Sequence, residues 1–133
     1  MNYFGIDVHD TYHKVCVMTH DGEILEYDIT NDDEGRELLC ELVSEHWPAR
    51  VTMEACTGAH ELHCLLEPVA EKVTLLHPGE FRTRFPKRGK KNDWIDAKCL
   101  CEAARLGVKG IWVPDEEIRQ RRILSTRRVS MTQ

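Results

Sequence analysis

The sequence lacks the features of secreted and membrane proteins. No apolar run approaches the roughly 18 residues that a membrane-spanning helix needs. The segment Met1–Asp7 has no basic stretch followed by an apolar one, as a signal peptide would. These absences predict a cytoplasmic protein with no membrane partner, and its 133 residues suffice for one compact domain.

The sequence also lacks any CxxC pair, although it contains six cysteines. A zinc ribbon is therefore not expected. Without a secretion signal, disulfides are not expected either, and a free cysteine in apolar surroundings behaves as a small hydrophobe. We expect reduced thiols, most of them packed in apolar surroundings, at Cys16, Cys40, Cys56, Cys64, Cys99 and Cys101.

Positive charge is scarce in the first part of the chain and abundant in the last. Residues 1–79 carry 16 acidic and 4 basic side chains, whereas residues 80–133 carry 7 acidic and 14 basic ones. The overall net charge of −5 therefore hides a basic C-terminal portion. Such asymmetry between the halves of a chain indicates an anionic partner.

The N-terminal region has the residue pattern of strands. Tyr3–Asp7 and His13–Met18 are rich in β-forming residues, and Ile24–Ile29 follows the strong hairpin signal Asp21-Gly22. Connections this short predict an antiparallel three-stranded meander.

Helices and strands then alternate. Apolar residues at helical spacing predict an amphipathic helix that begins near Glu34, extends to Trp47 and is stopped by Pro48. The next predicted elements are a strand, a helix and a strand: Arg50–Glu54, Ala59–Leu66 and Lys72–Leu76. A meander followed by such alternation predicts an α/β fold with a mixed sheet.

The C-terminal region has less regular signals. His77–Asn92 holds two prolines, two glycines and many cations, which predicts an exposed loop. Asp93–Leu106 is predicted as a helix ended by Gly107. Ile111–Val113 is a short extended piece, and from Asp115 onward an arginine-rich helix is expected.

Four acids occupy positions that suit a metal site. Asp7 and Glu54 stand at the ends of apolar strands, where a buried carboxylate is costly without a partner. Asp93 and Asp96 are three residues apart, so a helix would place both on one face. Carboxylates that converge in this way hold the two Mg²⁺ ions of phosphodiester cleavage. Taken singly, Asp93 could cap a helix, Asp7 could be a satisfied strand-end acid, and Glu54 could be an ordinary surface acid.

Three phrases of the sequence resemble the DEDD transposases of bacterial insertion sequences and the related Piv-type DNA invertases. The phrases are Gly5-Ile6-Asp7-Val8, Met53-Glu54-Ala55-Cys56-Thr57-Gly58 and Lys91-Asn92-Asp93-Trp94-Ile95-Asp96-Ala97. The resemblance implies a ribonuclease-H-like fold similar to that of the resolvase RuvC. It also implies catalytic and metal-binding roles for Asp7, Glu54, Asp93 and Asp96, with Mg²⁺ or Mn²⁺ as the cofactor, in DNA strand cleavage and transfer.

The resemblance also sets expectations for domains and partners. It implies a nuclease domain over residues 1–114 and the start of a connector helix over 115–133, whereas nothing matches the family's C-terminal serine domain. DNA is the expected partner. Some relatives use a guide RNA, and the full-length protein is expected to be a homo-oligomer.

A cationic run directly upstream of Asp93 supports the DNA partner. Its members are Arg82, Arg84, Lys87, Arg88, Lys90 and Lys91. Such side chains bind phosphates without reading sequence, although a solvated basic loop has the same composition. His9, two residues after Asp7, could also touch a metal or a phosphate.

Three other functions are compatible with parts of this pattern. A stand-alone RuvC-like Holliday-junction resolvase shares the fold and the metal chemistry. A non-catalytic nucleic-acid-binding module from a truncated transposase needs no acidic site. Actin-like sugar kinases also begin with a Gly-Ile-Asp phrase, but they need a second glycine-rich phosphate loop and a longer chain, and this sequence has neither.

Overall fold

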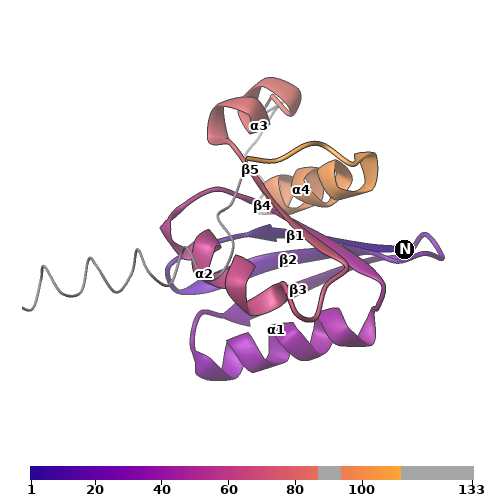
Figure 1. Ribbon diagram of the computed structural model, residues 1–133, viewed down its shortest axis with the longest axis vertical. Coiled ribbons are helices and arrows are strands. Elements are labelled where there is room, and N and C mark those ends of the chain that lie inside the picture. The colour runs from indigo at the N-terminus through magenta and orange to yellow at the C-terminus, as the bar shows by residue number, and fades with distance from the viewer. Residues whose placement is uncertain (87–93, 112–133) are drawn as a thin grey trace, which may run out of the picture.

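The computed structural model describes residues 1–86 and 94–111. Its first three strands, β1 (Asn2–Asp7), β2 (Tyr12–Met18) and β3 (Ile24–Thr30), pair antiparallel in chain order, as Figure 1 shows. Gly22 occupies the β2–β3 turn at a φ of 87°. Glycine tolerates that backbone conformation without steric cost, which is why the Asp21-Gly22 signal marks the turn correctly. The predicted meander is confirmed.

Two further strands complete the sheet on the other side of β1. β4 (Ala49–Glu54) pairs parallel with β1, and β5 (Lys72–Leu76) pairs parallel with β4, so the strand order is β3-β2-β1-β4-β5. The helices α1 (Asp33–Glu45) and α2 (Thr57–Leu66) connect these strands. A mixed five-stranded sheet with helices confirms the α/β prediction and is consistent with a ribonuclease-H-like fold.

The prediction of a continuous loop over His77–Asn92 is wrong in its first part, where α3 (Pro78–Arg84) forms a short helix. The ring of His77 accepts a hydrogen bond from the Gly79 amide at 3.0 Å and so caps the helix. Pro78 is favourable in the first turn, where no backbone donor is needed. Burial of Phe81 then anchors the helix, which composition alone did not indicate.

The last described helix, α4 (Ile95–Leu106), confirms the predicted end at Gly107, whose φ is 68°. It begins two residues after the predicted start, at the position that follows Trp94. The Ile111 amide donates to Leu75 O at 2.8 Å, so the predicted extended piece begins beside β5. The rest of that piece and the arginine-rich segment from Asp115 lie outside the described residues.

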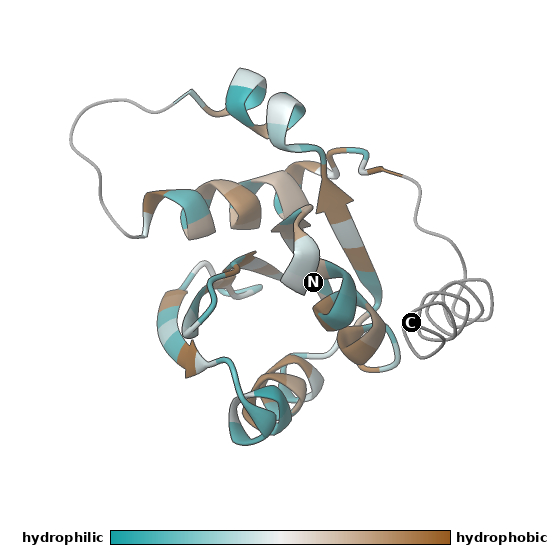
Figure 2. Ribbon diagram, turned by 90° about the vertical axis from the view of Figure 1, so that its left-hand side faces the viewer, coloured by the Kyte–Doolittle hydropathy of each residue, from teal (hydrophilic) through white to brown (hydrophobic). Residues whose placement is uncertain are grey.

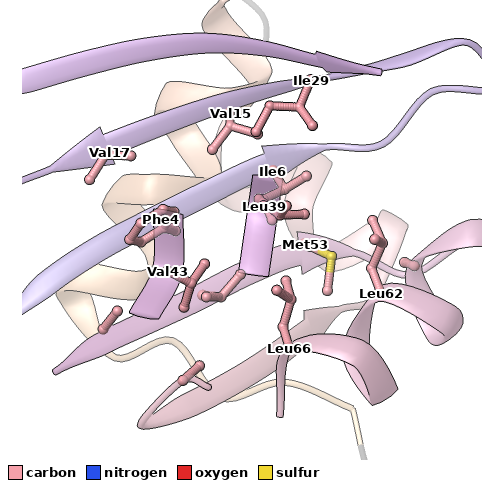
Figure 3. Packing of buried hydrophobic residues seen from close by; sticks show 14 of the residues in the cluster. Phe4, Ile6, Val15, Val17, Ile29, Leu39, Val43, Met53, Leu62 and Leu66 are labelled. Atoms are coloured by element: carbon pink, nitrogen blue, oxygen red, sulfur yellow. The ribbon is translucent and has the colours of Figure 1, made fainter. Parts of the chain in front are cut away.

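One face of the sheet carries the main hydrophobic core. Side chains from β1, β2, β3 and β4 meet those of α1 and α2, as Figure 3 shows. The largest fully buried contributors are Phe4, Ile6, Val15, Val17, Leu39, Val43, Met53, Leu66 and Leu75. The N-cap Asp32 accepts a hydrogen bond from the Gly35 amide at 2.8 Å and fixes the start of α1 over this core.

The opposite face is covered by α4, and Figure 2 shows α1 and α4 on opposite sides of the sheet. The backbone of α4 lies directly on β1 at Gly5, where an added Cβ would be 2.1 Å from Ala97 O and 2.2 Å from Cys101 N. Cys101 Sγ also donates to Tyr3 O at 3.0 Å. Only glycine permits this approach, so Gly5 sets the distance between helix and sheet.

The chain's cysteines are all free, as the sequence predicts. Cys16 and Cys101 are fully buried in a small cluster with Ala97 under α4. Within residues 1–86 and 94–111, no helix has both the length and the apolar character that a membrane crossing requires.

We expect Gly5→Ala to lower the free energy of unfolding by about 1–3 kcal/mol or more, because the new methyl group would overlap the α4 backbone. Urea denaturation would measure the loss. Gly58→Ala is the matched control, since its methyl group would meet only the Val8 side chain, at 3.2 Å. Equal stability of Gly5→Ala and the parent would contradict the close approach.

A pH dependence follows from His13, which is 2% exposed. Burial lowers the pKa of His13, whose Nδ1 accepts a hydrogen bond from the His9 amide at 3.2 Å. The unfolded chain therefore binds more protons than the folded one below about pH 6.5, and stability falls as the pH drops from there through the lowered pKa. The loss is at most about 1.4 kcal/mol per pH unit.

We expect His13→Leu to flatten the fall in stability between about pH 7 and about pH 5. Exposed His60 supplies the control: His60→Gln should keep the parent's pH profile. Urea titrations at each pH would measure both, and an unchanged slope in His13→Leu would argue against a neutral buried imidazole.

Candidate metal centre

Two of the four predicted acids end neighbouring parallel strands. Ile6 of β1 is in register with Met53 of β4, so the next residues along each strand, Asp7 and Glu54, emerge side by side. Both carboxylates are partly buried. The sheet thus brings together two residues that lie 47 positions apart in the sequence.

The third acid, Asp96, approaches from α4. It lies in the first turn of that helix, and it lines a cavity of about 510 Å³ together with Glu54. The other walls come from α3 and the residues after it: Phe81, Arg82, Phe85 and Pro86. Glu54 therefore lies beside Asp7 through the strand register and shares the cavity with Asp96.

The fourth acid, Asp93, lies outside the described residues, so its pairing with Asp96 on one helix face stays a prediction. Among the residues that the structure describes, no three histidine, cysteine, aspartate or glutamate side chains are grouped so that they could hold one metal ion. Asp7, Glu54 and Asp96 are three of the four predicted carboxylate ligands.

Asp7 is held by a neighbouring ring. His9 Nε2 lies 2.9 Å from Asp7 Oδ2, and the half-exposed imidazole also lies 6.0 Å from the Tyr12 ring, measured between centroids. The sequence marked His9 as a candidate contact for a metal or a phosphate. Its described partner is the Asp7 carboxylate, and a hydrogen bond of this kind orients a ligand oxygen.

Lys14 is a residue that the sequence analysis missed. It is in register with Asp7, and it is only 9% exposed. Its ammonium lies 2.6 Å from Asp28 Oδ1 and over the rings of Trp94 and Tyr12, at 4.7 and 5.1 Å from their centroids. The available signal was a lysine in a strand whose four following residues are all apolar.

A partly buried thiol, Cys99, lies three residues after Asp96 on α4. Burial first, and then the charges of Asp96 and Glu102, raise the pKa of Cys99. The thiol form, which is a poor metal ligand, is therefore favoured. The acids that approach one another here offer only oxygen donors, which hard divalent ions such as Mg²⁺ prefer.

The predicted phosphate-binding cations divide into two groups. Arg82 and Arg84 lie exposed on the last turn of α3, where Arg84 Nε is 3.2 Å from Glu80 Oε1 and Arg82 borders the cavity. The others lie outside the described residues: Lys87, Arg88, Lys90 and Lys91. A cation therefore stands at the rim of the cavity that holds Glu54 and Asp96.

Comparison with known proteins gives a consistent result. The family model DEDD_Tnp_IS110, described as Transposase, matches residues 4–133. The transposase for insertion sequence element IS1328 of Yersinia enterocolitica is 32% identical over 100 residues, which cover 74% of this chain and 28% of that protein. The putative transposase y4pF/y4sB of Sinorhizobium fredii (strain NBRC 101917 / NGR234) is 31% identical over 90 residues, covering 68% and 23%.

These matches span about a quarter of the length of the two curated relatives. They nevertheless include most of this chain, and the family model includes residues 4–7 of β1 and the whole of β4 and α4, the elements that carry the acids. On these grounds, the chain belongs to the IS110-type family of DEDD transposases.

Proposed function

We propose that this chain is the nuclease domain of a DNA transposase, and that Asp7, Glu54, Asp93 and Asp96 hold Mg²⁺ or Mn²⁺ for strand cleavage and transfer. The observation that carries the proposal is the position of Glu54. It stands beside Asp7 through strand register and shares a cavity with Asp96. Asp93 joins them by its place in the sequence, three residues before Asp96.

The donor set fits a hard divalent ion, because carboxylate oxygens are the ligands that Mg²⁺ accepts while it keeps several waters. When two such ions are bound, they activate the attacking oxygen and stabilise the leaving oxygen of a phosphodiester. The chain's own residues orient this chemistry. His9 holds one oxygen of Asp7, and α4 holds Asp96 against the sheet.

The DNA backbone is the proposed partner of the cations beside this site. Arg82 stands at the cavity rim, where a phosphate near the acids would meet it. Lys87, Arg88, Lys90 and Lys91 follow in the sequence and are proposed to extend the same contact. Complete transposition, a guide RNA and a homo-oligomer belong to the proposal for the whole protein.

Metal binding predicts a ligand-dependent melting temperature. Mn²⁺ or Mg²⁺ should raise the Tm of the parent chain, because an ion at 100 times its Kd adds about 2.7 kcal/mol to the folded state. Glu54→Gln and Asp96→Asn should each lose most of this rise, since each removes a charged ligand. Differential scanning fluorimetry across a metal titration would measure it.

Glu61→Gln is the matched control, because Glu61 is an exposed acid on α2. It should keep the parent's full response. No rise in the parent, or an equal loss in Glu61→Gln, would count against a site built from these acids.

DNA binding predicts a change in salt dependence. Arg82→Glu should weaken duplex binding and reduce the slope of log K against log salt by about 0.9, the value for one lost phosphate contact. The pair Arg88→Glu and Lys90→Glu should reduce it by about twice that amount. Fluorescence anisotropy at several salt concentrations would give the slopes.

Lys72→Glu controls for net charge, because Lys72 is exposed at the first residue of β5, four positions before the end that meets Glu54. It should leave the slope near the parent value. If all these variants weaken binding equally, the cations act through overall charge and not through an interface beside the cavity.

A further inference from the structure

Lys14 carries a charge in a nearly buried place, and such a charge is costly unless it is paired. The strand register puts Lys14 opposite Asp7 of β1 and opposite Asp28 of β3. Directly opposite residues of antiparallel strands point to the same face of the sheet. Three charged side chains therefore form a row across β1, β2 and β3 on the face that α4 covers.

The contacts of Lys14 connect this row to α4. Asp28 Oδ1 holds its ammonium at 2.6 Å, and the cation lies 4.7 Å from the Trp94 centroid. That distance is within the range of a cation–π interaction, which strengthens when the cation is shielded from water. Trp94 stands directly before α4, two residues ahead of Asp96.

Contacts further along α4 hold other parts of the helix. Lys98 Nζ lies 3.3 Å from Glu26 Oε1, and Cys101 Sγ donates to Tyr3 O. These fix the middle of the helix against β1 and β3. The Lys14–Trp94 contact acts at the end that carries Asp96.

We propose that Lys14 is a positioning residue for the metal centre, one that clamps Trp94 to the sheet and thereby fixes the start of α4 relative to Asp7. The inference rests on the proposed metal site. Asp28 holds the lysine from the outer strand, so the clamp is a chain of three residues: Asp28, Lys14 and Trp94. It sets the separation of Asp7 and Asp96, which come from different elements.

The clamp needs a cation that binds a carboxylate and an aromatic face together. Methionine at position 14 would keep the apolar stem and lose both interactions. Arginine would keep both, because a guanidinium pairs with carboxylates and stacks on rings. Lys14→Met should therefore weaken Mn²⁺ binding by about tenfold or more, as losses of ligand-orienting partners do, and Lys14→Arg should restore most of it.

Isothermal titration of Mn²⁺ into the full chain would measure these affinities. Lys98→Met is the matched control, since it removes one lysine that ties α4 to β3 at a partly exposed site. Its Kd should stay near the parent value. An unchanged Kd in Lys14→Met, or an equal loss in Lys98→Met, would overturn the proposal.

A second readout reports on the clamp without metal. In a background of Trp47→Phe and Trp112→Phe, the emission of Trp94 should shift to the red in Lys14→Met, and Lys14→Arg and Lys98→Met should keep the parent spectrum. Unchanged emission in Lys14→Met would also overturn the clamp. A parent chain that fails to bind Mn²⁺ would refute the proposed function, and the Trp94 spectra would then decide the clamp alone.

Asp28→Asn keeps the test decisive if Lys14→Met does not fold. Asp28 is largely exposed on the outer strand β3, so its replacement removes the partner of Lys14 without opening the core. It should shift the Trp94 emission in the same direction and weaken Mn²⁺ binding less than Lys14→Met. A parent-like spectrum and Kd would contradict the clamp.

Discussion

The close approach of α4 to β1 at Gly5 is the contact on which the rest of the molecule depends. Two backbones meet there with no side chain between them. Asp96 is carried by this helix and Asp7 ends this strand, so the glycine two residues before Asp7 fixes how closely the middle of α4 approaches β1, while the proposed Lys14 clamp acts at the start of the helix. The packing of α4 on the sheet and the candidate metal site therefore both depend on Gly5.

The two faces of the sheet carry different kinds of side chain. Aliphatic side chains gather under α1 and α2 and supply the burial that stabilises the fold. Under α4 the sheet presents Gly5, the buried thiol of Cys16 and a row of charges: small groups that allow the helix to approach, and ionic groups that contact its start. This division explains how a domain with one main core keeps acids partly buried beside it.

The strands and most helices were predictable from sequence, because period-two and helical patterns report which side chains face a core. The strand ends at Asp7 and Glu54 were found in the same way. Helix α3 was missed because its anchor, Phe81, is buried by tertiary contacts that the local pattern does not show, and because its cap is the ring of His77, which is not one of the usual capping residues. Lys14 was missed for a similar reason, since its partners come from β3 and from the residue before α4. The place of Asp93 beside Asp96 stays a prediction.

The hydrogen bond from Cys101 to Tyr3 spans 98 positions of the chain. The pairing of β1 to β5 needs no residue of α4, whereas α4 can dock only on a face that the paired strands have already formed. Contacts between residues so far apart in the sequence form slowly, because closing a long loop costs conformational entropy. Strand pairing alone brings Asp7 beside Glu54, and Asp96 joins them only when α4 docks, so the candidate site depends on the contact of longest sequence separation described here.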